Sequence, residues 1–123
     1  MNKTATDQEV KKHLKKLNGY EYNLFNNICE HTNIDFKNLF SNSRRHNFVN
    51  ARKIAVHFLM KKDYKLENIG RCIGIKPKDH STVLYLNKKA TEHYKLEIDF
   101  KNTVDSINNI ISTRSFTSLK YKN

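Results

Sequence analysis

Glycine, proline and cysteine are scarce in this sequence, and the shortages exclude several classes of protein. Of the 123 residues, three are glycine, one is proline and two are cysteine. No glycine precedes a Lys-Ser or Lys-Thr pair, so the chain lacks the Gly-x-x-x-x-Gly-Lys-Ser/Thr loop that cradles ATP phosphates. Cys29 and Cys72 lie far apart and form no Cys-x-x-Cys motif, which fits neither a zinc ribbon nor a disulfide scaffold. We therefore expect no ATP, no metal and no other cofactor.

Long hydrophobic runs are also missing. No apolar segment approaches the roughly 20 residues that a membrane-spanning helix needs, and the polar residues 1–7 lack the apolar core of a signal peptide. Each cysteine is then best explained as a small buried residue in a reducing compartment. We expect a cytoplasmic protein without a membrane partner.

Positive charge, in contrast, is abundant and is concentrated in one part of the chain. Lys and Arg number 23 against 12 Asp and Glu, which gives a net charge of +11. Residues 41–95 hold 13 basic and four acidic residues, whereas residues 1–40 and 96–123 each have a net charge of only +1. A basic segment with near-neutral flanks is typical of a protein that binds a polyanion.

Apolar residues recur at helical spacing along most of the chain, which predicts an all-α fold. The clearest helix is expected over residues 47–62, where one stripe contains Phe48, Ala51, Ile54, Ala55, Phe58 and Leu59. A basic amphipathic lead-in helix is expected within residues 1–20. Further helices are expected over about residues 21–31, 35–40, 66–74, 80–93 and 96–112. The predicted architecture is a small domain of about five to six helices over residues 21–112, followed by a flexible tail at 113–123.

The lead-in helix has two interpretations. Val10, Leu14 and Leu17 recur at helical spacing, with lysines between them. The helix either lies on a membrane or a partner, or packs these three residues on the domain. We favour packing, because three apolar residues make a weak membrane anchor.

Two of the expected helices have the layout of a helix-turn-helix. Residues 66–74 are typical of a short helix that ends in glycine, and Pro77 stops helix continuation in the connection that follows. The next helix opens with the run Asp79-His80-Ser81-Thr82, after which Val83 and Leu84 begin its apolar side. In DNA readers of this layout, the second helix enters the major groove.

The four polar residues that open this helix can make different contacts. Asp79 can accept a hydrogen bond from a cytosine amino group or can cap the helix, and the two roles are weighed evenly. His80 can bond to a purine edge, the alternative being an ordinary surface histidine. Ser81 and Thr82 can bond phosphates, and the Thr82 methyl group can touch a thymine methyl group.

Basic residues elsewhere complete the candidate DNA-binding set. Arg44 and Arg45 lie in a polar loop and are candidates for the minor groove, the alternative being a solvated pair of charges. Arg52 and Lys53 are candidate phosphate contacts, which position a protein without reading sequence, and Lys78 is a further candidate. Replacement of Arg52 is then expected to weaken binding to all sequences and to flatten the salt dependence by about one unit.

The sequence resembles the C-terminal box-binding domain of the bacterial replication initiator DnaA over about residues 22–95. The likeness is carried by three runs, which are Ala51-Arg52-Lys53-Ile54-Ala55 with Leu59, Leu66-x-x-Ile69-Gly70-Arg71 with Gly74, and Asp79-His80-Ser81-Thr82-Val83-Leu84. The resemblance implies an all-helical fold with a basic loop and a helix-turn-helix, which binds a short asymmetric origin box as a monomer.

The resemblance also implies roles for individual residues. Arg44 matches the family's minor-groove arginine. The residues that match other DNA-facing positions are Arg52, Lys53 and Leu66, and those that match the major-groove side are Asp79, His80, Ser81 and Thr82. The sequence departs from the family in a longer turn at residues 75–78. It also has Glu67 where proline is common and Lys53 where glutamine is common.

These patterns predict a stand-alone protein that is not an enzyme and that binds double-stranded DNA sequence-specifically, at a site similar to an origin box. The protein is expected to be associated with the nucleoid, with replication proteins as candidate partners. A transcription regulator with its own target site needs the same module and is an alternative, as is a non-specific nucleic-acid binder. A nuclease or transposase would need a metal cluster such as His-x-His, and the six histidines form none. Binding of RNA or single strands would need exposed aromatic residues, whereas those of this chain fall mostly on apolar stripes.

Overall fold

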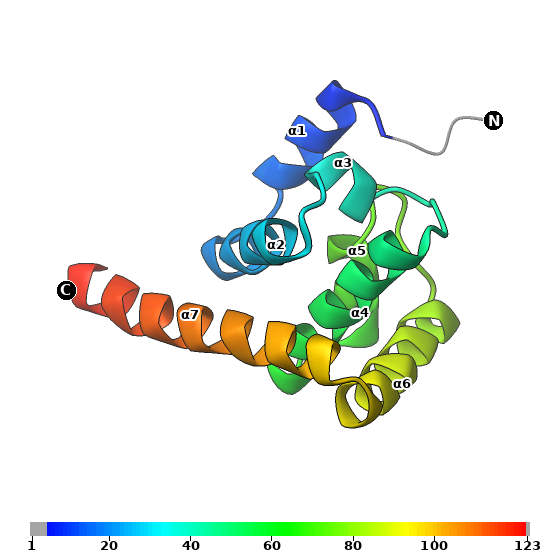
Figure 1. Ribbon diagram of the computed structural model, residues 1–123. Helices are drawn as coiled ribbons and strands as arrows, with labels where there is room; N and C mark the ends of the chain where they lie inside the picture. The colour runs from blue at the N-terminus through cyan, green and yellow to red at the C-terminus, as the bar shows by residue number, and fades with distance from the viewer. Residues whose placement is uncertain (1–4, 123) are drawn as a thin grey trace.

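The structure is a computed structural model that describes residues 5–122, without the side chains of residues 113–122. This part of the chain contains seven helices and no strand, so the all-α prediction is confirmed. The helices are α1 (Asp7–Lys15), α2 (Gly19–Thr32), α3 (Phe36–Leu39), α4 (His46–Lys61), α5 (Leu66–Cys72), α6 (His80–Leu96) and α7 (Ile98–Lys122) (Figure 1). Six of them, α2 to α7, form the domain for which five to six helices were expected, and α1 is the lead-in helix expected within residues 1–20.

Polar side chains fix where the first two helices begin. The Thr6 hydroxyl accepts a hydrogen bond from the backbone N–H of Glu9, whose carboxylate accepts one from the backbone N–H of Thr6. Asn18 and Glu21 form the same reciprocal pair at the start of α2. Each pair satisfies two backbone N–H groups that a helix leaves unpaired at its start.

Helix α4 lies at the centre of the core. It packs against α6 on one side and α2 on another, and α7 closes the core against α2 and α6. The stripe predicted for α4 is buried apart from Phe48, which is half-buried. The inward residues predicted for α6 and α7 are buried as well, namely Val83, Leu86, Ala90, Phe100, Val104, Ile107 and Ile111. Burial of each large apolar side chain contributes roughly 1.5–3 kcal/mol.

The lead-in helix α1 packs on the domain, as favoured from the sequence. Leu14 and Leu17 are partly buried against the core, but the most buried residue of α1 is His13, which is 7% exposed. The His13 ring lies 4.5 Å from that of Phe40, and its Nε2 donates to the backbone carbonyl of Cys72 at 2.8 Å. The helix therefore docks against both α3 and the end of α5.

The last helix is longer than expected. It reaches Lys122, whereas the apolar stripe predicted an end near Ser112. No glycine or proline interrupts residues 98–122, so the backbone meets no helix breaker there. The side chains beyond Ser112 lie outside the described residues, and the predicted flexible tail at 113–123 stays a prediction. No helix in the described part is long and apolar enough to cross a membrane.

The turn between α5 and α6 passes very close to Gly70. A Cβ atom placed on Gly70 would lie 2.2 Å from the carbonyl oxygen of Lys78, whose backbone N–H donates to the Gly70 carbonyl at 3.0 Å. Only glycine leaves room for this approach. The helix-turn-helix geometry therefore depends on the missing side chain.

Gly70→Ala is expected to lower the free energy of unfolding by about 1–3 kcal/mol, because the added methyl group would force the turn backbone outward. Urea unfolding followed by circular dichroism measures this. Gly19→Ala is the matched control, since a Cβ atom there meets nothing within 4 Å. A Gly70→Ala variant as stable as the wild type would contradict the account.

Burial of His13 is expected to make stability depend on pH. Desolvation lowers the pKa of His13 below its ordinary value of 6.5, against the raising effect of the Cys72 carbonyl. As the pH falls, the unfolded chain therefore takes up a proton on His13 before the folded chain does. The contribution of neutral His13 to the free energy of unfolding is present above pH 6.5, the ordinary pKa, and is lost as the pH falls through the lower pKa of the folded state. Urea unfolding should show a steeper loss of stability below about pH 7 for the wild type than for His13→Gln. Equal slopes would contradict the assignment.

Candidate nucleic-acid interface

The loop before α4 and the turn before α6 lie against each other, although they are far apart in the sequence. The Ile75 backbone N–H donates to the Phe40 carbonyl at 3.3 Å. The Lys78 Nζ donates to Oδ1 of Asn42 in the loop. These two bonds place loop 41–45 beside the N-terminus of α6, so the candidate minor-groove and major-groove residues share one edge of the molecule.

Asp79 caps helix α6. Its Oδ1 accepts a hydrogen bond from the Thr82 backbone N–H at 2.8 Å, and bonds with Thr82 lower the pKa of the exposed carboxyl. The capping role weighed from the sequence is therefore observed. Asp79, His80 and Ser81 are exposed and Thr82 is half-buried, while contact with a base stays a prediction.

The exposed face of α6 extends further than expected. Leu84 was predicted to begin the apolar side, but it is 50% exposed. It lies four positions after His80, which puts both on one side of a helix, and Val83 turns to the core instead. The full exposed stripe contains His80, Ser81, Leu84, Tyr85 and Lys88. Leu84, Tyr85 and Lys88 were not among the residues expected at the interface. A spacing of four residues from His80 and Ser81 predicts all three on this face.

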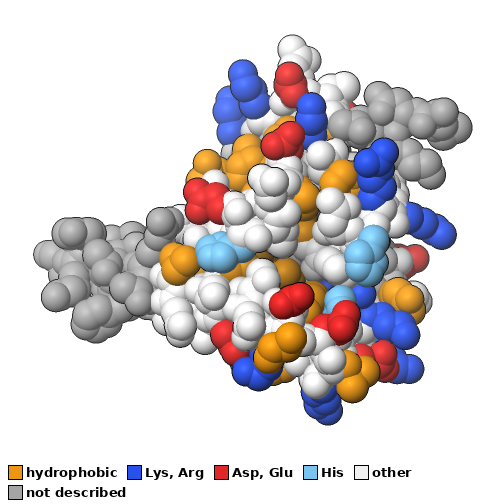
Figure 2. Space-filling view, viewed as in Figure 1, with side chains coloured by type: hydrophobic (Ala, Val, Ile, Leu, Met, Phe, Trp, Pro, Cys, Tyr) orange, Lys and Arg blue, Asp and Glu red, His pale blue; other side chains and the backbone are white. Residues whose placement is uncertain are grey.

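The loop arginines are also exposed. Arg44 and Arg45 precede α4 in a segment without regular structure, and the Arg45 guanidinium carbon lies 6.0 Å from the centre of the Phe48 ring. Figure 2 shows several Lys and Arg side chains along the right-hand edge of the view, where Figure 1 places α6 and this loop. The arrangement offers positive charge on the side that the α6 stripe occupies.

The other three candidates are less accessible. Arg52 is 5% exposed and donates hydrogen bonds to oxygen atoms of α3 and the loop, so the phosphate contact expected of it has no support from its position and stays a prediction. Lys53 is half-buried, and its Nζ lies 3.3 Å from Oδ1 of Asn50. Burial and the nearby Lys89 lower the pKa of Lys53. Leu66 is the first residue of α5 and packs partly buried against the core.

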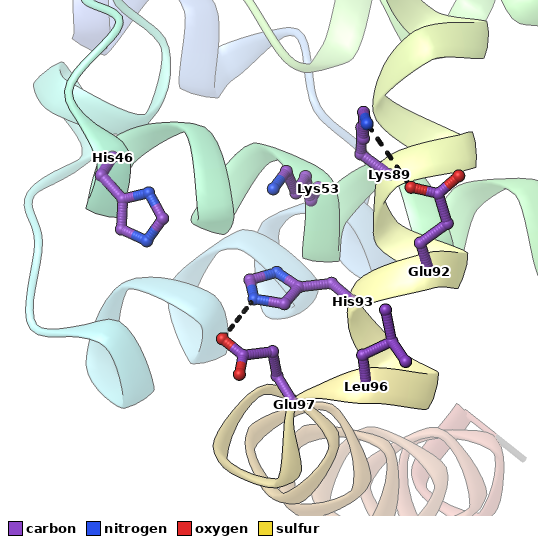
Figure 3. Close-up of a pocket in the computed structure, with 7 residues that line it drawn as sticks. All are labelled: His46, Lys53, Lys89, Glu92, His93, Leu96 and Glu97. Atoms are coloured by element: carbon purple, nitrogen blue, oxygen red, sulfur yellow. Dashed lines mark hydrogen bonds and ion pairs between the residues drawn. The ribbon is translucent and has the colours of Figure 1, made fainter.

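A shallow groove between α4 and α6 has a different character. Figure 3 shows its lining, which comprises His46, Lys53, Lys89, Glu92, His93, Leu96 and Glu97. Lys89 pairs with Glu92 at 3.5 Å, and His93 bonds to Glu97 at 3.3 Å. Acidic partners offset the basic residues of this groove. It therefore attracts anions less than loop 41–45 and the N-terminus of α6 do. Among the described residues, no group of three or more His, Cys, Asp or Glu could hold a metal ion.

Comparison with known families gives a match over residues 23–90, to the bacterial dnaA protein helix-turn-helix. This range holds the basic loop, α4, α5 and most of α6, and it confirms the resemblance drawn from the motifs. No solved structure matches the chain.

Three curated relatives are similar to this chain, each a chromosomal replication initiator protein DnaA. The one from Bacteroides fragilis is 25% identical over 77% of this chain and 20% of its own length. The one from Bacteroides thetaiotaomicron is 27% identical over 72% of this chain and 18% of its own length. The one from Lachnoclostridium phytofermentans is 32% identical over 63% of this chain and 17% of its own length. The chain thus spans about a fifth of the relatives it matches.

Proposed function

The chain belongs to the bacterial DnaA helix-turn-helix family, a DNA-binding and non-catalytic domain, and on that premise we propose that it binds double-stranded DNA at a specific sequence. The observation that supports this most is the shared edge of loop 41–45 and the N-terminus of α6, which Lys78 and Asn42 join. In this proposal α6 enters the major groove and the loop enters the adjacent minor groove.

Each exposed side chain then has a role that suits its chemistry. Asp79 and His80 face base edges, and the hydroxyls of Ser81 and Thr82 bond to phosphate or base. Arg44 inserts into the minor groove and Arg45 lies beside it. Lys53, Lys78 and Leu66 lie closer to the sugar-phosphate backbone.

The proposed target is a box-like site of the kind that replication initiators recognise. The curated relatives are named as chromosomal replication initiators, and the matched segment contains all ten candidate site residues. We propose a monomeric binder that acts on replication initiation at such sites. The apolar stripe of α7 supports this oligomeric state, because its described residues are buried within the domain rather than left for a second copy.

Selection of bound sites from a random duplex library, at near-physiological salt, tests the proposal. We expect enrichment of a short asymmetric motif similar to the initiator's box. Enrichment of an unrelated motif would indicate a transcription regulator with its own targets. Salt-sensitive binding without enrichment would contradict sequence-specific recognition and leave charge-driven binding, which weakens steeply with salt.

Asp79→Asn separates the two roles of Asp79. Asparagine caps a helix about as well as aspartate, so the free energy of unfolding should change little. Its amide, however, presents a hydrogen-bond donor to the major groove where the carboxylate presents only acceptors. We expect a loss of about 1–3 kcal/mol in binding to the selected site and little change on scrambled duplex. Fluorescence anisotropy titrations measure this. Unchanged affinity for the selected site would show that Asp79 only caps α6.

A further inference from the structure

Arg52 is the most extensively bonded side chain of the matched segment, and all of its partners lie in or beside the loop that carries Arg44. Its acceptors are Leu39 O at 2.7 Å from Nε, Ser43 O at 2.7 Å from Nη1, and Asn38 O and Ser41 Oγ at 3.0 and 3.1 Å from Nη2. A guanidinium has five N–H donors in a rigid fork. Arg52 therefore holds four separate points on a short stretch of chain.

The buried charge of Arg52 is compensated by hydrogen bonds to α3 and the loop. The side chain is 5% exposed, and its four acceptors are carbonyl or hydroxyl oxygens rather than carboxylates. Desolvation lowers the pKa of Arg52 to about 10, so the group keeps its charge near neutral pH. A buried charge is tolerated only where hydrogen bonds replace its lost hydration. Those bonds all go to α3 and the loop.

The loop is also held by bonds of its own and by Lys78. Ser41 Oγ donates to the Asn38 carbonyl at 2.9 Å and accepts from the Ser43 backbone N–H at 3.2 Å, which closes a tight bend. Lys78, from the turn before α6, donates to Oδ1 of Asn42. Residues 38–43 are therefore bonded to both Arg52 of α4 and Lys78 of the turn before α6.

We infer that Arg52 is a positioning residue, which fixes the bend at residues 38–43 so that Arg44 and Arg45 emerge at a set place beside α6. The inference rests on the proposed function, because it gives the loop its role in DNA binding. A loop that is already ordered loses less conformational freedom when it enters the groove. Direct contact with phosphate is opposed by burial, because the side chain is 5% exposed and four of its five N–H groups already have acceptors.

Arg52→Lys separates positioning from phosphate contact. Lysine keeps the charge, but its single ammonium cannot match the fork that holds four oxygens. If Arg52 positions the loop, affinity for the selected duplex should fall about tenfold although the positive charge is kept. The loss should vanish in an Arg44→Ala/Arg45→Ala background, because no loop arginine is left to position.

A second readout needs no DNA. Backbone order parameters from ¹⁵N relaxation should fall for loop residues 41–45 in Arg52→Lys, from values near 0.85 towards about 0.6. Ser41→Ala removes one of the four acceptors with little change of volume, and it should show a smaller effect of the same kind if Arg52→Lys does not fold. Ile107→Val is the control for general destabilisation, since it lies in the core on α7 and should alter neither the loop nor the affinity.

The outcomes separate the two ideas. A tenfold loss that depends on Arg44 and Arg45, together with a mobile loop, supports the positioning role. An equal loss in the double-alanine background, or a rigid loop in Arg52→Lys, would overturn it. If the wild type prefers no duplex, the proposed function is overturned, and with it the role of Arg52 in DNA binding. A mobile loop in Arg52→Lys would still show in that case that Arg52 holds the bend.

Discussion

Helix α4 is the constraint on which the proposed interface depends, because it contacts both α6 and the loop that carries the arginines. Its apolar stripe packs against α6, where Val83, Leu86 and Ala90 face inward. Arg52 of α4 donates hydrogen bonds to two carbonyl groups of α3 and to the Ser43 carbonyl of the loop. The spacing between α6 and the loop arginines is thus set by one helix rather than by two independent segments.

The turn before α6 adds a second tie between these elements. Gly70 lets the backbone of Lys78 approach α5, and the Lys78 side chain then reaches Asn42. The turn at residues 75–78 contacts the end of α3 through the bond from Ile75 to Phe40, and the loop through the bond from Lys78 to Asn42. The start of α6 is in this way packed against the loop.

Local signals in the sequence were enough to predict much of this arrangement. The stripe of α4 and the polar run at Asp79 follow from helical period and capping, which act within a few residues. Contacts across the chain were not predictable in this way. The bond from His13 to Cys72 spans 59 positions, and the acceptors of Arg52 are mostly backbone carbonyls, which no residue pattern reports. The exposure of Leu84 follows from its position on the helix, four residues after His80, and not from its apolar character.

Titration of the ¹⁵N-labelled protein with the selected duplex, followed by amide chemical shifts, tests the central claim most directly. The account predicts that the largest shifts fall on loop 41–45 and on the first half of α6, with little change in α1 and in the described part of α7. Shifts concentrated on α1 or α7 instead would contradict it, because DNA would then bind a face that the helix-turn-helix does not form.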